Sequence, residues 1–139
     1  MRYLALDIGT KRTGVAYGDD DVGIALALPT LTHNSMEELQ EHVRALVKER
    51  RIDRLVVGLP LLPGGTEGSQ ATLVREAAAP LQSEGISVDF IDERHTTSKK
   101  PKRRSRKHAP DIPRGDPDSV AASQILEMRW AIDNRNIMS

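Results

Sequence analysis

The fold is decided by the first stretch of the chain, RYLALDIGTKRTGVAYG at residues 2–18. The residues before Asp7 are almost all apolar, which is typical of a strand covered on both faces. Asp7 then ends this strand with a carboxylate, which is costly to bury unless a cation compensates it. Gly9 permits a tight turn, and the apolar residues after Arg12 predict a second strand in a hairpin. The sequence therefore predicts one acidic group on a central strand, beside a cationic rim formed by Lys11 and Arg12.

Asp7 also has a simpler interpretation, in which its carboxylate accepts backbone N–H bonds from the Gly9-Thr10 turn. Two more acidic positions favour a shared site instead. Glu93 ends a later predicted strand. Asp118 lies on the core-facing side of a predicted final helix, which starts at Asp116-Pro117 with an N-cap aspartate and a proline at the first helical position.

Length and composition limit the class of protein. The chain has 139 residues, which suits one domain with its own core, and we expect a single domain over residues 1–139. Lys and Arg together number 20, as do Asp and Glu, so the formal net charge is zero. There is no cysteine, which excludes disulfides and thiolate metal sites. No apolar run approaches the ~20 residues that span a bilayer, and we expect a cytoplasmic protein without a membrane partner.

Strand and helix signals alternate along the chain, which predicts an α/β fold. Three strands are expected as an antiparallel meander, the last of them ending at Pro29. Ser35 and Glu38 have the spacing of a helix capping box, and an apolar stripe continues that helix to about Arg51. Residues 55–58 predict a buried strand, which a right-handed crossover makes parallel to the first. The predicted strand that ends at Glu93 is the fifth, and the five strands are expected to form a mixed sheet in the order 3-2-1-4-5.

Residues 98–115 are predicted to form a mobile basic loop. Seven of the nine residues between Lys99 and Lys107 are basic, namely Lys99, Lys100, Lys102, Arg103, Arg104, Arg106 and Lys107. So dense a run of basic residues is typical of a protein that binds a polyanion such as a phosphate backbone, although a solvated loop can have the same composition.

The three carboxylates of Asp7, Glu93 and Asp118 are expected to meet, because the first, fourth and fifth strands are neighbours in this sheet. Such a cluster repels itself unless cations bind it, and Mg²⁺ or Mn²⁺ prefers oxygen ligands. Two such ions about 4 Å apart can activate water and stabilise the leaving oxygen in phosphodiester hydrolysis. Asp118 could instead only interact favourably with the dipole of its helix, because it lies near the N-terminus of that helix. Asp116 is better suited to be the N-cap residue than a metal ligand.

Four motifs in this order resemble the YqgF/RuvX-type family of Holliday-junction-resolvase-like proteins, which are described as pre-16S rRNA nucleases. They are LDIGTKRTGVA at residues 6–16, VGLP at residues 57–60 with Gly65, DERHTT at residues 92–97, and DSVAASQIL at residues 118–126. The resemblance implies an RNase H-like fold, with a five-stranded mixed sheet and helices on both faces. It also implies a metal-dependent nuclease in which Asp7, Glu93 and Asp118 are the catalytic metal ligands.

The leading hypothesis is a two-metal nuclease that processes the 5′ end of pre-16S rRNA. Its phosphate contacts are assigned to Thr10, Lys11, Arg12, Arg94 and the basic residues of the loop. One alternative is a resolvase that cuts branched DNA, and another is a non-catalytic nucleic-acid-binding protein. A less favoured alternative is an ATPase, because residues 7–10 also resemble the phosphate loop of sugar-kinase and actin-type ATPases. Either a monomer or a homodimer is compatible with the sequence.

Overall fold

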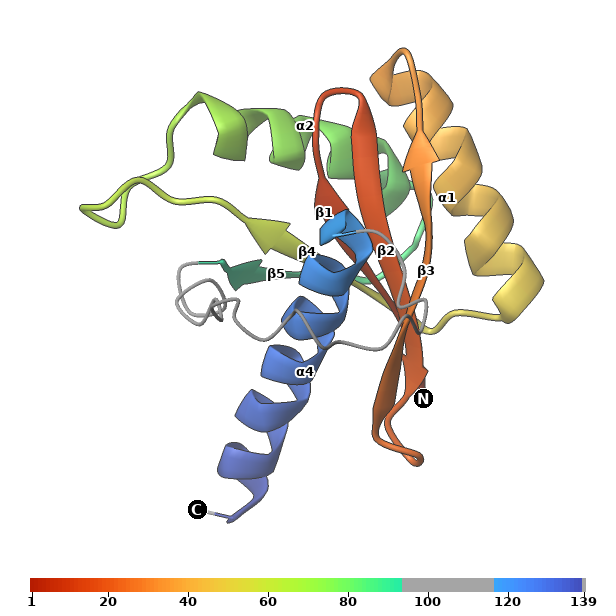
Figure 1. Ribbon diagram of the computed structural model, residues 1–139, viewed down its shortest axis with the longest axis vertical. Coiled ribbons are helices and arrows are strands. Elements are labelled where there is room, and N and C mark those ends of the chain that lie inside the picture. The colour runs from red at the N-terminus through yellow and green to blue at the C-terminus, as the bar shows by residue number, and fades with distance from the viewer. Residues whose placement is uncertain (94–116, 139) are drawn as a thin grey trace, which may run out of the picture.

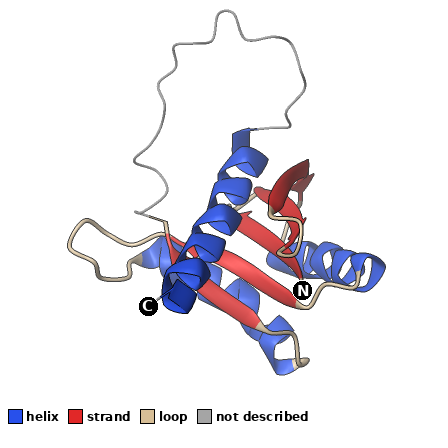
Figure 2. Ribbon diagram, turned by 90° about the horizontal axis from the view of Figure 1, so that it is seen from below, coloured by secondary structure: helices blue, strands red, loops and turns tan. Residues whose placement is uncertain are grey.

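A computed structural model of the chain describes residues 1–93 and 117–138. The elements in chain order are β1 (Arg2–Ile8), β2 (Arg12–Asp19), β3 (Ile24–Thr32), α1 (Met36–Arg50), β4 (Arg54–Leu59), α2 (Ser69–Ser83), β5 (Val88–Asp92) and α4 (Pro117–Met138). The strands form one sheet, with α1 and α2 on one face and α4 crossing the other (Figure 1). Figure 2 shows the helices on both sides of the strands. None of the described helices combines the length and the apolar character needed to cross a membrane.

The strands lie in the order β3-β2-β1-β4-β5, which confirms the predicted order. β1 pairs antiparallel with β2 and parallel with β4, and β4 pairs parallel with β5. In this register Asp7 lies opposite Gly14 of β2, and Leu6 lies opposite Val57 of β4. The C-terminal end of the central strand therefore meets the start of β2 and lies at the same edge of the sheet as the ends of β4 and β5.

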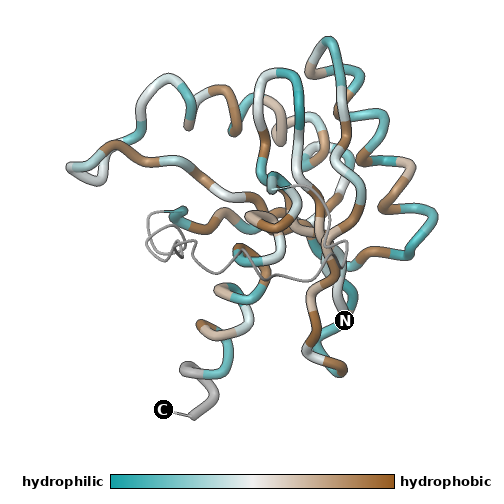
Figure 3. Tube along the Cα trace, viewed as in Figure 1, coloured by the Kyte–Doolittle hydropathy of each residue, from teal (hydrophilic) through white to brown (hydrophobic). Residues whose placement is uncertain are grey.

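Alternating side chains of the strands divide the apolar core into two layers. Leu4 and Leu6 of β1 belong to the layer beneath α1 and α2, whereas Tyr3 and Ala5 belong to the layer beneath α4. Figure 3 shows the apolar residues along the strands, with hydrophilic and apolar residues alternating along the helices. Because successive side chains of a strand point to opposite faces, Asp7 shares the face of Ala5 and lies on the α4 side of the sheet.

The first helix begins and ends at the residues that the sequence indicates. The Ser35 hydroxyl accepts the Glu38 N–H at 3.1 Å, and the Glu38 carboxylate accepts the Asn34 N–H at 2.7 Å. At the other end Arg51 is the C-cap residue, in the left-handed conformation with φ 55°. This capping box fixes the exit of β3 onto α1 close to the start of β2.

The third strand was expected to end at Pro29 and instead continues to Thr32. The pairing register shifts there, because Val15 lies opposite Leu28 while Thr13 lies opposite Leu31. β3 is an edge strand, and a bulge on an edge tolerates a residue without an N–H to donate. The proline therefore bends the strand locally rather than ending it.

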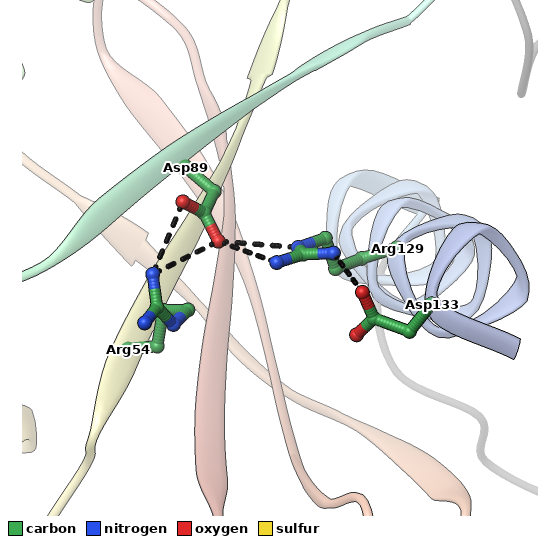
Figure 4. A network of polar contacts seen from close by, with 4 residues as sticks. All are labelled: Arg54, Asp89, Arg129 and Asp133. Atoms are coloured by element: carbon green, nitrogen blue, oxygen red, sulfur yellow. Dashed lines mark hydrogen bonds and ion pairs between the residues drawn. The ribbon is translucent and has the colours of Figure 1, made fainter. Parts of the chain in front are cut away.

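A network of charged side chains ties α4 to β4 and β5 (Figure 4). Asp89 of β5 accepts hydrogen bonds from Arg54 of β4 at 3.2 Å and from Arg129 of α4 at 3.0 Å. Arg129 also donates to Asp133, one turn further along α4. The Arg129 side chain is only 20% exposed, so its charge depends on these partners more than a surface arginine would.

Replacing Asp89 by Asn is expected to lower the free energy of unfolding by about 1–3 kcal/mol, because two arginines lose a charged acceptor in a partly buried place. Chemical denaturation with urea measures this change. The matched control is Glu67→Gln, which breaks a two-bond pair with Arg75 whose side chains are 39% and 47% exposed. The control variant should lose less of its free energy of unfolding, because its ion pair is more exposed. Equal losses in the two variants would contradict the role given to the network.

Candidate active site

Asp7 is half-buried near the C-terminal end of the central strand, and glycines flank it on both neighbouring strands. Gly14 lies directly opposite Asp7 on β2. On the other side, Gly58 follows Val57, the residue of β4 that pairs with Leu6. Without side chains at these two positions, other groups can approach the Asp7 carboxylate from either side.

Gly14 lets the start of α4 rest on β2. A Cβ atom at Gly14 would overlap the carbonyl group of Asp118 and come within 2.8 Å of the Ser119 nitrogen. The buried Ser119 hydroxyl accepts the Val15 N–H at 3.0 Å and lies 3.2 Å from the Thr30 hydroxyl. The backbone of Asp118 is therefore held against the strand that pairs with the Asp7 strand.

Gly58 makes room for the third carboxylate. A Cβ atom at Gly58 would come within 2.8 Å of the Glu93 Cγ and would overlap its carboxylate. The Glu93 N–H also donates to the Leu59 carbonyl at 3.2 Å, which holds the end of β5 beside β4. Glu93 shares the α4 face with Ile91, as the strand alternation in the sequence predicts.

The carboxyl groups of Asp7 and Glu93 hydrogen bond to each other. Burial, followed by the charge of Asp7, raises the pKa of Glu93 to about 8. Burial also raises the pKa of Asp7, and the negative charge of Asp118 adds to that rise. Of the two carboxyl groups, that of Glu93 has a pKa of about 8, so it holds its proton to a higher pH than an ordinary glutamate does.

Asp118 is held by an arginine from the start of β2. Its Oδ2 atom accepts Arg12 Nη2 at 2.7 Å and Arg12 Nε at 3.1 Å. The ligand atoms of Asp7, Glu93 and Asp118 do not all lie within 4.8 Å of one another, a limit that among the described residues only Asp19, Asp20 and Asp21 satisfy. Asp7 and Glu93 therefore form a pair, whereas Asp118 acts on Asp7 through its charge and is bound by Arg12.

The group of Asp19, Asp20 and Asp21 lies at the opposite end of β2 from Arg12. The amino group of Met1 contacts Asp20 at 3.0 Å and Asp19 at 3.7 Å, and the side chains of these two aspartates are 38% and 29% exposed. The group also borders a 710 Å³ pocket with an acidic lining, which includes Asp20, Asp21, Glu127 and Asp133. This lining opposes binding of a phosphate backbone, and we assign the group no catalytic role.

Lys11 and Arg12 line a second pocket, of about 290 Å³, next to the start of α1. His33 also lines it, and its ring bonds to the Thr13 hydroxyl at 2.9 Å. Thr10 is exposed in the turn that leads to these residues, which the Gly9 N–H closes by donating to the Arg12 carbonyl at 3.0 Å. The predicted cationic rim therefore lies beside the carboxylates, with Arg12 in contact with both the pocket and Asp118.

The other predicted phosphate contacts lie outside the described residues. These are Arg94, Lys99, Lys100, Lys102, Arg103, Arg104, Arg106 and Lys107. The predicted loop at residues 98–115 and the predicted N-cap Asp116 also lie outside them, whereas α4 begins at Pro117 as expected.

Sequence reasoning missed the pair between Arg12 and Asp118, the buried Ser119 and the role of the glycines. One signal was present, since Gly14, Ala16 and Gly18 alternate and so share one face of β2. Small residues on one strand face favour the close approach of a helix. At Gly18 a Cβ atom would lie 2.6 Å from the Trp130 ring of α4.

The donors at this site fit a divalent cation. Asp7, Glu93 and Asp118 offer only carboxylate oxygens, which Mg²⁺ and Mn²⁺ prefer. Burial and their mutual repulsion raise the pKa of Glu93, and Arg12 balances the charge of Asp118. An ion of charge +2 could take the place of both the Glu93 proton and Arg12.

The fold is that of the RuvC-like class of RNase H-like proteins. The structure titled "T. thermophilus RuvC in complex with Holliday junction substrate" is similar to this chain with a TM-score of 0.66 at 11% identity, over 95% of this chain and 94% of that one. A further Thermus thermophilus RuvC structure gives a TM-score of 0.59 at 13% identity, over 96% of each chain. At such identities the likeness establishes the fold alone.

The chain belongs to the RuvX family, whose model, described as "RuvX: Holliday junction resolvase", matches residues 1–130. A relative from Opitutus terrae is 37% identical over 135 residues, covering 91% of this chain and 89% of its own. One from Thermus thermophilus is 37% identical over 130 residues, covering 91% and 95%. Both carry the name "Putative pre-16S rRNA nuclease". The family resemblance of the four sequence motifs is thereby confirmed.

Replacing Gly14 by Ala is expected to lower the free energy of unfolding by about 1–3 kcal/mol, since the added methyl group must push the start of α4 away from β2. Urea denaturation measures the loss. Gly64→Ala is the control, because a Cβ atom at Gly64 meets nothing within 4 Å. If both variants were equally stable, the contact between Gly14 and α4 would not be as close as described.

Glu93→Gln is expected to become more stable than wild type as the pH rises from 5 to 8 in the presence of a chelator. Folded Glu93 keeps its proton up to a pKa of about 8, whereas the unfolded chain loses it near 4.5, so wild-type stability falls across this window. Glutamine has no proton to lose. After allowance for partial exposure, the gain at pH 8 should be about 1 kcal/mol, or about 2–8 °C in Tm.

Thermal unfolding at several pH values tests this expectation. Glu67→Gln is the control, because its ion pair with Arg75 lowers the pKa of Glu67 and removal of that charge should bring no gain. A constant difference between Glu93→Gln and wild type from pH 5 to 8 would contradict the raised pKa.

Proposed function

We propose that this protein is a metal-dependent nuclease that hydrolyses phosphodiester bonds, and that it processes the 5′ end of pre-16S rRNA. The observation that carries the proposal is the approach of Asp7, Glu93 and Asp118, from three separate elements, to the end of the central strand. Membership of the RuvX family and the names of the curated relatives support it.

In this proposal Asp7, Glu93 and Asp118 hold the divalent ions, Mg²⁺ or Mn²⁺. Bound ions at such a site supply the activation of water and the stabilisation of the leaving oxygen that phosphodiester hydrolysis requires. The protein's part begins with the proton that Glu93 shares with Asp7, which must leave before both carboxylates can act as ligands. Gly14 and Gly58 keep the space around Asp7 open.

Cationic side chains beside the carboxylates would bind the phosphates of the substrate strand. Lys11 and Arg12 line the pocket next to the site, and Thr10 is exposed in the same turn. Arg94 and the basic residues between Lys99 and Lys107 extend this assignment on the basis of the sequence. Their positive charges would add salt-dependent affinity for any nucleic acid.

A branched DNA is the second candidate substrate, because the family model is described as a Holliday junction resolvase. Symmetrical cutting of a four-way junction would require two copies of the chain, whereas cutting of RNA requires only the carboxylates of one copy. We therefore connect the RNA hypothesis with a monomer and the junction hypothesis with a homodimer. Processing of ribosomal RNA would take place in the cytoplasm.

With Mn²⁺ or Mg²⁺, wild type is expected to cleave a structured fragment spanning the 5′ end of pre-16S rRNA. Asp7→Asn, Glu93→Gln and Asp118→Asn should each lower the rate by more than about 100-fold, since even residues around metal ligands typically contribute 10- to 100-fold. A four-way DNA junction, assayed in parallel, ranks the two substrates by rate.

The control for this assay is Asp20→Asn, which removes an equal charge from the distant acidic group. It should cleave at the wild-type rate. A wild-type rate in Glu93→Gln would contradict the assignment of the site. Tight binding of both substrates without any cleavage would favour the non-catalytic alternative.

A further inference from the structure

The contact between Arg12 and Asp118 is specific in its geometry but easily reached by solvent. Two hydrogen bonds of the guanidinium go to the same carboxylate oxygen, Oδ2, at 2.7 and 3.1 Å. The Arg12 side chain is 59% exposed and that of Asp118 is 36% exposed. An ion pair this exposed contributes little net free energy, so another anion or cation can separate it.

The backbone brings these two residues together. Arg12 is the first residue of β2, and Gly14, two residues further on, supports the first turn of α4 from which Asp118 projects. Arg12 therefore lies near Asp118 whenever α4 is seated on the strand. The pairing does not depend on a mobile segment finding its partner.

Arg12 also lines the 290 Å³ pocket together with Lys11 and His33. Glu38 is the acidic residue of this lining, and its carboxylate accepts the Asn34 N–H at 2.7 Å. A guanidinium can donate two parallel hydrogen bonds to a phosphate, and a phosphate bound here would also gain from the charge of Lys11. The same guanidinium can thus serve either Asp118 or a phosphate of the substrate strand.

A divalent cation and Arg12 compete for Asp118. Arg12 occupies Oδ2 of Asp118, a carboxylate that would hold the ion in the proposed metal site, and the positive charge of Arg12 beside an ion would repel it. A phosphate that draws Arg12 away would remove both obstacles. The arrangement therefore links binding of nucleic acid to binding of metal.

We propose that Arg12 is exchanged between Asp118 and a substrate phosphate, so that nucleic acid and divalent cations bind cooperatively. Arg12 holds Asp118 in the free protein and releases it when a phosphate enters the pocket. Because coupling between two ligands is reciprocal, the metal favours nucleic-acid binding by the same factor. This inference rests on the proposed function, and it makes Arg12 a positioning residue for Asp118 as well as a phosphate contact.

The first experiment measures Mn²⁺ affinity of the full chain by calorimetry without nucleic acid. Arg12→Gln should bind Mn²⁺ more tightly than wild type, by about two- to fivefold, the range that an exposed ion pair supplies. Lys11→Gln removes the same charge one residue away and should change the affinity less. Arg12→Lys keeps the charge without the two-bond contact and should lie between wild type and Arg12→Gln.

The second experiment measures the affinity for a pre-16S rRNA fragment in the presence of a chelator, where no cleavage occurs. Asp118→Asn should bind RNA more tightly, by about two- to fivefold, because it weakens the two hydrogen bonds that hold Arg12 at Asp118. Asp7→Asn changes a neighbouring carboxylate and leaves the bonds between Arg12 and Asp118 in place, so it should gain less. The advantage of Asp118→Asn should disappear in the Arg12→Gln background.

Two results would overturn the inference. If wild type binds Mn²⁺ and Arg12→Gln binds it equally or more weakly, the exchange is wrong while the metal site stands. If Asp118→Asn gains no more RNA affinity than Asp7→Asn, Arg12 is not the group released. Absence of Mn²⁺ binding to wild type would instead contradict the proposed function itself, and the inference with it.

Discussion

The contact between the first turn of α4 and Gly14 of β2 is the constraint on which the candidate active site depends. It joins residues far apart in sequence without any side chain between them. Because Gly14 pairs with Asp7 in the sheet, the same contact sets how close Asp118 comes to the central strand. The buried Ser119 hydroxyl reinforces it by accepting the Val15 N–H. Further along α4, the network around Asp89 prevents the helix from turning about this point (Figure 4).

Most of the fold follows from local patterns that keep their meaning in the folded chain. Alternating and continuous apolar runs indicated the strands, and the capping box at Ser35 fixed the start of α1. The error at Pro29 arose because proline ends a strand only where its missing N–H is needed, and a bulge on an edge strand has no such need. Edge position is a property of the whole sheet, so the residues around Pro29 carry no sign of it.

The carboxylates of the site could be predicted, but their partners could not. Asp7 and Asp118 stand out because each places a charge on a face that the pattern predicts to be apolar, and Glu93 stands out because it ends a predicted strand. Arg12 stands among other polar residues, and its bond to Asp118 depends on the angle at which α4 crosses the sheet. The raised pKa of Glu93 likewise depends on burial and on Asp7, two influences that arise only after the strands have assembled. The acidic residues of the candidate site could therefore be predicted from the sequence, whereas the groups that balance their charges depend on the fold.

The distribution of charge along β2 gives the two ends of this strand opposite charges. Lys11 and Arg12 stand at its start and Asp19 to Asp21 at its end, which are about 23 Å apart at ~3.3 Å per residue. With no net charge, attraction at long range is weak, yet the field of a polyanion attracts the end of β2 with Lys11 and Arg12 and repels the end with Asp19 to Asp21. The end of β2 with Asp19 to Asp21 therefore faces away from the polyanion, and the end with Lys11 and Arg12 faces it. Diffusing encounters are thereby oriented before any contact forms, and rising ionic strength shortens the distance over which this happens.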